Sequence, residues 1–313
     1  MDIGLEQAIT IDVGGAIEWL VELIQQNLGP LLDAIRAVVG FLAEGLESIL
    51  MSLPPWILAL LILLLALWRV GWRFGIFVVA AVIVIFGMGL WSETVSTMSL
   101  VIASSFVALL IGFPAGIAMA KNNAVEAVIR PVLDFMQTMP PFVYLIPAVI
   151  FFGLGKVPGA IATVIFAMPP AVRLTNLGIR QVSAEHVEAG LAFGCTDRQL
   201  LYKVQLPLAL PNIMQGVNQT IMLALSMVVI AAMIGAGGLG QTVVTGIQRM
   251  NTGLGFEGGL GVVIVAILLD RLTESFGKTK QGEGLVTKAK RLLRGNQQQT
   301  AEEGETETGR AAS

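Results

Sequence analysis

The sequence predicts an all-α polytopic membrane protein with about seven transmembrane helices. Hydrophobic residues make up 55% of the chain and charged residues only 13%, whereas charged residues make up about 25% of a typical soluble domain. The hydrophobic residues gather in runs close to the roughly 20 residues that a helix needs to cross a bilayer. Short polar loops separate these runs, and lysine and arginine are concentrated in alternate loops. The chain is therefore expected to cross a membrane several times.

An amphipathic N-terminal extension, residues 1–53, precedes the spans. Apolar side chains recur at helical spacing between acidic ones on both sides of Gly29 and Pro30. This pattern predicts two helices that lie along the membrane surface or against the spans. No cleavable signal peptide is expected, because Asp2 and Glu6 stand where such a peptide has a basic region.

The spans divide into two additional transmembrane helices in residues 54–92 and a core of five in residues 93–277. They are expected at about residues 56–68, 74–91, 95–120, 132–153, 158–179, 208–234 and 260–276. Prolines in the fourth span predict a kink there, because proline removes a backbone donor. The low-complexity tail, residues 278–313, is predicted to be cytoplasmic and disordered, because its composition offers little apolar surface to bury.

Positive charges predict the orientation of the chain, because short cytoplasmic loops are enriched in lysine and arginine. Seven spans divide the loops into two groups, and most of these residues fall in one group, among them Arg69, Lys121 and Arg130. The sequence therefore predicts an N-terminus outside the cell and a C-terminus inside. The loop between the fifth and sixth spans, residues 183–207, is predicted to be cytoplasmic.

This loop is the longest polar-rich passage between spans. Ser183 is a candidate cap for a first short helix, and Gly194 is expected to end that helix. Thr196 and Gln199 have the T-x-x-Q spacing of a capping box that starts a second helix, and two prolines are expected to bound its far end. Two short helices joined at a glycine form a compact projection suited to a groove in another protein. An ordinary connecting loop is the alternative interpretation.

The spacing within the loop resembles the EAA signature of ABC importer membrane subunits, E-A-A-x3-G-x9-I-x-L-P. The matching positions are Glu188, Ala189, Gly190, Gly194, Val204, Leu206 and Pro207. Gly190 and Val204 replace the second alanine and the isoleucine of the signature. In that family the loop is a coupling helix that docks in a cleft of the cytoplasmic ATPase subunit. The resemblance implies that Glu188 lies at this contact, whereas the alternative for Glu188 is a solvated surface charge.

A longer resemblance covers residues 91–276. The segments 136–159, 165–182 and 203–240, which begin MQTMPP, IFAMPP and KVQLPL, resemble the permease subunit of glycine betaine/proline-type osmoprotectant importers. The resemblance implies a five-span type I importer core in a bacterial cytoplasmic (inner) membrane. It also implies a second permease copy in a homodimer, two ATPase subunits and an external or periplasmic substrate-binding protein.

The implied mechanism is alternating access, with ATP and Mg²⁺ bound by the partner ATPase and no cofactor bound by this chain. The implied substrate is a quaternary ammonium compound: glycine betaine, choline or proline betaine. The glycine-rich segment 235–240 lacks the G-x4-G-K-[ST] pattern of a nucleotide-binding loop. We therefore expect no ATPase activity, no catalytic residue and no metal site in this chain, and no nucleic-acid partner; membrane lipids are its other expected contacts.

Three polar side chains share one face of the sixth span: Asn212, Gln215 and Gln219. Polar groups within a membrane are costly unless they face protein or water. These residues are candidates to line the translocation path, and hydrogen bonding to a neighbouring helix is the alternative.

Three other functions remain open at the level of the sequence. The chain also fits the permease of an ABC importer for another small solute, such as an amino acid. A stand-alone channel or secondary transporter typically needs ionisable residues deep in its spans, whereas the ionisable residues here gather near predicted cytoplasmic ends. A non-transporting scaffold would leave the docking loop unexplained.

Overall fold

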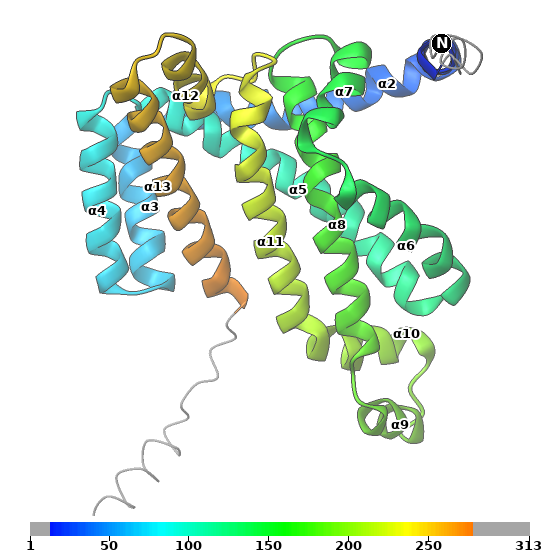
Figure 1. The fold of residues 1–313 in the computed structure, drawn as a ribbon. Helices are drawn as coiled ribbons and strands as arrows, with labels where there is room; N and C mark the ends of the chain where they lie inside the picture. The colour runs from blue at the N-terminus through cyan, green and yellow to red at the C-terminus, as the bar shows by residue number, and fades with distance from the viewer. Residues whose placement is uncertain (1–12, 278–313) are drawn as a thin grey trace, which may run out of the picture. The chain divides into compact units, whose positions relative to one another are not determined.

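The structure is a computed structural model that describes residues 13–277, and in this range it contains helices and turns and no strand (Figure 1). The all-α prediction is confirmed. Contacts divide the chain into residues 1–277 and residues 278–313. The predicted tail and residues 1–12 of the predicted N-terminal extension lie outside the described residues.

Helix α2 (Val13–Ser52) is one 40-residue helix, so the prediction of two helices separated at Gly29 and Pro30 is wrong. Pro30 has no N–H to donate to the carbonyl of Gln26. Gln26 is exposed, so water can take the place of the missing donor and the helix continues. Water at this exposed carbonyl therefore lets the helix continue despite the local preference of proline to interrupt it.

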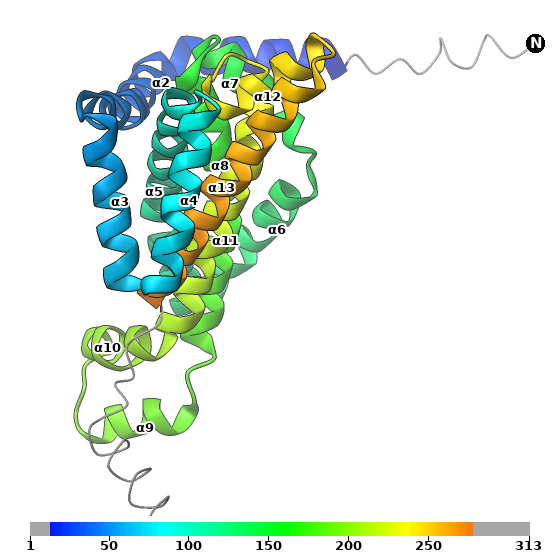
Figure 2. The ribbon, with the colours of Figure 1, turned by 90° about the vertical axis from the view of Figure 1, so that its left-hand side faces the viewer.

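Helix α2 lies across one end of the helix bundle, as both views show (Figures 1 and 2). Lys156 forms an ion pair with Glu47 of α2 and donates to the Ser96 hydroxyl at 2.7 Å. The Gln25 amide donates to the carbonyl of Ile150 at 3.3 Å. These contacts connect α2 to three segments that are distant in sequence.

A hairpin of two short apolar helices follows. These are α3 (Pro55–Arg69) and α4 (Trp72–Gly87), with 15 and 16 residues. At 1.5 Å per residue each spans about 22–24 Å, less than the roughly 30 Å of a hydrocarbon core. The guanidinium of Arg69 donates to the carbonyl of Ser275 at 3.1 Å and so connects the hairpin to α13 (Thr252–Gly277).

The core of the bundle consists of α5 (Trp91–Lys121), α8 (Lys156–Arg180) and α11 (Leu206–Ala232), joined by α12 (Gly238–Gln248) and by α13. Length and composition qualify four of the described helices as membrane spans, or up to six when each sharply bent helix pair is counted as one span. The number seven and the orientation of the termini stay predictions.

The predicted fourth span, residues 132–153, is not one kinked helix. It is divided between α6 (Asn123–Thr138) and a 3₁₀ turn followed by α7 (Leu145–Phe152), and the two parts are bent by 111°. Met139 has the extended conformation, with φ −72° and ψ 134°, because the following proline disfavours a helical conformation at this position. The chain therefore turns sharply where a kink was predicted.

The glycine-rich segment 235–240 packs at the end of the bundle where α2 and α12 lie (Figure 1). The backbone N–H of Leu239 donates to the Thr97 hydroxyl at 2.8 Å, and the N–H of Gly155 donates to the carbonyl of Ile234 at 2.8 Å. The glycines thus join α11 to α12 by close backbone packing against α5 and the start of α8.

Small residues bring α5 and α8 into close contact. A Cβ atom at Gly116 would lie 2.6 Å from the Val172 carbonyl oxygen and 2.6 Å from the Thr175 Cβ. No such approach is possible for a larger residue without separating the two backbones. This is the packing by which helices associate in membranes, where close van der Waals contact replaces the hydrophobic effect.

We predict that Gly116→Ala destabilises the protein because its methyl group forces α5 away from α8, with an overpacking cost of about 1–3 kcal/mol. Gly45→Ala in α2 is the matched control, because a Cβ there meets nothing within 4 Å and alanine favours a helix by about 1 kcal/mol. Thermal unfolding midpoints in detergent measure both effects. A midpoint for Gly116→Ala at or above that of the natural protein would contradict the prediction.

Candidate functional site

The loop predicted to dock on an ATPase forms a helical projection at the end of the bundle opposite α2 and α12 (Figures 1 and 2). It consists of α9 (Ala184–Ala192), α10 (Asp197–Leu200) and a π-helical turn (Leu201–Gln205) that leads into α11. We call these residues, 183–207, the coupling loop.

Two of the predicted local signals of the coupling loop are confirmed. Thr196 and Gln199 form a capping box in which each side chain accepts a hydrogen bond from the other residue's backbone N–H, at 3.4 and 2.9 Å. Gly194 follows the end of α9 with φ +77°, a left-handed conformation that glycine adopts without the steric cost that a Cβ brings. The turn between the two helices thus depends on Gly194.

Two other predictions about the coupling loop are wrong. Ser183 precedes α9, but its side chain caps no backbone N–H; its hydroxyl instead pairs with Nδ1 of His186 at 2.6 Å. The prolines do not end the second helix, because the chain stays helical through Pro207 and Pro211. The π turn widens the helix just before them, and the N–H of Leu206 bonds to the carbonyl of Leu201, five residues back.

The six predicted site residues divide between the surface and the interior of the coupling loop. Four are exposed: Glu188, Ala189, Gly194 and Pro207. Gly190 is buried, and a Cβ there would lie 2.7 Å from Leu200 Cδ1, so its small size allows α9 to pack on the following helix. Leu206 is half-buried and packs in a small apolar cluster at the root of the loop.

Three exposed apolar side chains on the coupling loop were not predicted. Phe193 is 91% exposed, Tyr202 is 65% exposed and Leu191 is 50% exposed. The detectable signal was large apolar residues in a loop predicted to lie in the cytoplasm. Glu188 is exposed on the same loop, so the coupling loop carries both apolar and acidic side chains on its surface.

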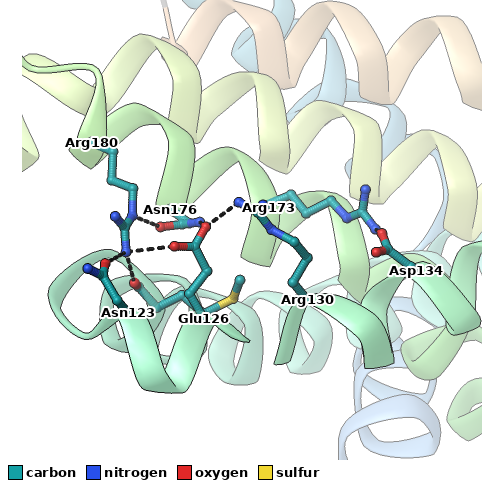
Figure 3. Close-up of polar contacts among 8 residues, drawn as sticks. Asn123, Glu126, Arg130, Asp134, Arg173, Asn176 and Arg180 are labelled. Atoms are coloured by element: carbon teal, nitrogen blue, oxygen red, sulfur yellow. Dashed lines mark hydrogen bonds and ion pairs between the residues drawn. The ribbon is translucent and has the colours of Figure 1, made fainter. Parts of the chain in front are cut away.

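A cluster of charged and amide side chains connects the root of the coupling loop to α5 and α6 (Figure 3). Glu126 of α6 forms ion pairs with Arg130 and with Arg180, the latter at 2.8 Å. The amide of Asn176, which is buried, donates to Glu126 at 3.3 Å. The partners of Arg180 on α5 and α6 are more than 50 residues away in sequence, so local residue spacing does not reveal them.

The predicted translocation residues lie along α11 in different surroundings. Asn212 donates to the Gln181 side chain at 3.2 Å, near the root of the coupling loop. Gln215 and Gln219 are exposed, and the same face continues through Met222 and Ser226, which are also exposed. The exposed face of α11 is thus two residues longer than predicted. Asn212 differs from the other two predicted residues because its side chain is hydrogen-bonded to the segment that follows α8.

Asn218 lies off that face and its amide donates to the Asp270 carboxylate at 2.9 Å, between α11 and α13. This bond is an example of the alternative role, in which a polar side chain holds two helices together. The polar residues of α11 therefore differ according to the side of the helix on which they lie: Asn218 bonds to α13, whereas Gln215 and Gln219 are exposed.

Comparison with known proteins places the chain among transport proteins. Residues 108–278 match the family described as binding-protein-dependent transport system inner membrane component. The chain is 50% identical to the glycine betaine/carnitine transport permease protein of Listeria monocytogenes, over 88% of this chain and 98% of that protein. It is 46% identical to the glycine betaine/proline betaine transport system permease protein of Escherichia coli, over 86% of this chain and 75% of that protein.

The fold resembles a solved structure as well. A chain of the MetNI methionine ABC transporter, in an inward-facing conformation, matches with a TM-score of 0.54 and 21% identity, over 58% of this chain and 91% of that chain. At this identity the likeness concerns the fold alone. It supports the helical arrangement of the predicted importer core.

Proposed function

The chain belongs to the inner membrane component family of binding-protein-dependent transport systems, and from this membership we propose how it carries its substrate. It is a multi-pass inner membrane protein and the permease subunit of an osmoprotectant importer. The observation that carries this function is the identity of 43–50% with glycine betaine permeases over most of the chain. Glycine betaine is the substrate we propose first, followed by choline and proline betaine.

We propose that the coupling loop docks on a cytoplasmic ATPase subunit, which binds and hydrolyses ATP with Mg²⁺. The exposed Phe193 supports this role, because an aromatic ring that fills a partner's pocket contributes much of the affinity of an interface. Glu188 adds an exposed charge on the same projection. The close packing at Gly190 supports it further, because a compact projection transmits force better than a loose one.

We propose that the exposed face of α11 lines the translocation path and that a second copy of the chain lies across it. Gln215 and Gln219 would be costly in contact with lipid, so water or protein is the more favourable neighbour. A substrate-binding protein delivers the solute at the opposite end of the bundle from the coupling loop. When the two ATPase subunits close on ATP, the permease opens toward the outside. After hydrolysis the ATPase subunits separate and the permease opens toward the cytoplasm.

The transport function predicts uptake that depends on the partners. Cells without their own betaine carriers would express this chain with the neighbouring genes for an ATPase and a binding protein. We expect uptake of labelled glycine betaine that disappears when the ATPase cannot hydrolyse ATP. Uptake of an amino acid in place of glycine betaine, choline and proline betaine would favour the other importer class, and uptake without the ATPase would indicate a channel or secondary transporter.

Glu188→Lys is expected to reduce uptake and substrate-stimulated ATPase activity by at least about 10-fold, which corresponds to a loss of about 1.4 kcal/mol in docking. The protein should still insert, because Glu188 is exposed on the coupling loop. Glu22→Lys in α2 is the matched control, since it makes the same charge change at an exposed position at the other end of the bundle. Unaltered coupling in Glu188→Lys would count against the docking role.

If the exposed face of α11 lines the translocation path, the side chain at position 219 should be accessible to water. In a Cys195→Ser background, the thiol of Gln219→Cys should react with a charged, membrane-impermeant thiol reagent, because the reactive thiolate forms only in water. Ile83→Cys in α4 is the control, since Ile83 is 64% exposed in an apolar helix and is expected to face lipid. Reaction rates that differ by less than about twofold would argue against a path along this face.

A further inference from the structure

Arg180, the last residue of α8, connects three helices through its side chain (Figure 3). Its guanidinium donates to the Met119 carbonyl of α5 at 2.7 Å and to the Asn123 side chain at 2.8 Å. It also pairs with Glu126 of α6 at 2.8 Å and donates to Asn176 of its own helix at 2.9 Å. A single planar cation thus holds the turn between α5 and α6 against the end of α8.

The contacts suit the properties of the groups that make them. Met119 lies in the last turn of α5, where carbonyl groups have no helical partner and carry the negative end of the helix dipole. Asn123 is the first residue of α6. The guanidinium presents five donors in a rigid plane, so one side chain can satisfy all these acceptors at once, which a lysine ammonium does less well.

Arg180 lies close to the coupling loop in sequence, so the cluster can respond to a movement of that loop. The coupling loop begins at Ser183, only three residues after Arg180. A displacement of the loop therefore reaches Arg180 through less than one helical turn of backbone. From there it reaches the α5–α6 turn through the hydrogen bonds and the ion pair, without passing through the apolar core.

Arg130 provides a contrast within the same cluster. It also pairs with Glu126, but it lies on α6 itself, one turn away, and its side chain is 65% exposed compared with 34% for Arg180. Loss of Arg130 removes a charge partner within one helix. Loss of Arg180 removes the connection between helices.

Helix α6 keeps other attachments when Arg180 is changed. Ile129, Leu133 and Met136 pack with Met119 and Val172 in an apolar cluster between α5, α6 and α8. Asp134 forms a second ion pair, with Arg173, two turns along α8. The fold is therefore expected to survive the loss of the Arg180 contacts, so the effect of losing them can be measured.

We propose that Arg180 is a positioning residue for transport, which makes the α5–α6 turn follow the movement of the coupling loop. The proposal rests on docking of the coupling loop to the ATPase. In this role Arg180 contacts neither the substrate nor the ATPase. It acts through Glu126, Asn123 and the Met119 carbonyl, and it couples ATP-driven motion to the helices of the bundle.

The test uses the complete importer with its ATPase and binding protein, and compares Arg180→Gln with Arg130→Gln. For Arg180→Gln we expect the ATPase to co-purify and its basal rate to stay within about twofold of the natural complex. The maximal rate of glycine betaine uptake should fall at least about 10-fold, while the substrate concentration at half-maximal rate stays the same. Arg130→Gln should transport at close to the natural rate, and Arg180→Lys should recover part of the activity.

Hydrogen exchange gives a readout that a merely structural role would not change. Amides of residues 119–126 should exchange alike in the resting natural and Arg180→Gln complexes. Their exchange should change on trapping with ATP and vanadate in the natural complex only. If Arg180→Gln does not reach the membrane, Glu126→Gln replaces it, because it removes the Arg180 ion pair from the other side. Since it also removes the Arg130 pair, it is compared with Arg130→Gln, which lacks the Arg130 pair alone.

Normal uptake in Arg180→Gln with the ATPase bound would overturn the proposal, and so would an equal loss in Arg130→Gln. The proposal would also be overturned if trapping with ATP and vanadate changed the hydrogen exchange of residues 119–126 in Arg180→Gln as it does in the natural complex. Failure of the docking proposal looks different. In that case the natural complex does not retain the ATPase, or Glu188→Lys leaves coupling unaltered.

Discussion

The close contact of α8 with α5 and α11 is the constraint on which the rest of the structure depends. Small residues such as Gly116 allow the helices to touch backbone to side chain, and α8 is the most buried of the candidate spans. Because α8 is fixed on both sides, its end presents the coupling loop in a defined place. The same rigidity gives α8 the means to transmit a displacement from that loop.

The polar side chains of the helix bundle fall into two groups, those that bond to a neighbouring helix and those that are exposed. Asn218 and Asp270 pair between α11 and α13, and Arg180 satisfies acceptors on three helices. Gln215 and Gln219, by contrast, lie on the exposed face of α11. In a membrane protein this division has functional meaning, because a polar side chain that no helix satisfies needs water or another subunit.

The coupling loop has a closely packed interior and exposed apolar and acidic side chains on its surface. The capping box and the turn at Gly194 define its two helices, and Gly190 lets them pack together. Phe193 and Glu188 then remain exposed on the outside. In the proposed docking this surface contacts the ATPase subunit, and the cluster around Arg180 connects the loop to α5 and α6.

Several features follow from the sequence alone. Composition and hydrophobic runs predicted an all-α membrane protein, and the spacing of the EAA-like segment indicated the family. The capping box of Thr196 and Gln199 and the turn at Gly194 were also predicted correctly. All of these depend on residues close together in the chain, where turn chemistry and helical spacing act directly.

Only the tertiary structure decided the features that depend on neighbours distant in sequence. It showed α2 continuous through Pro30, set the 111° bend that follows Met139, and packed Gly190 against Leu200 inside the coupling loop. It also brought Arg180 to Met119 and Glu126. The physical reason is that the direction and partners of a side chain are set by helix packing, which sequence spacing along one helix does not specify.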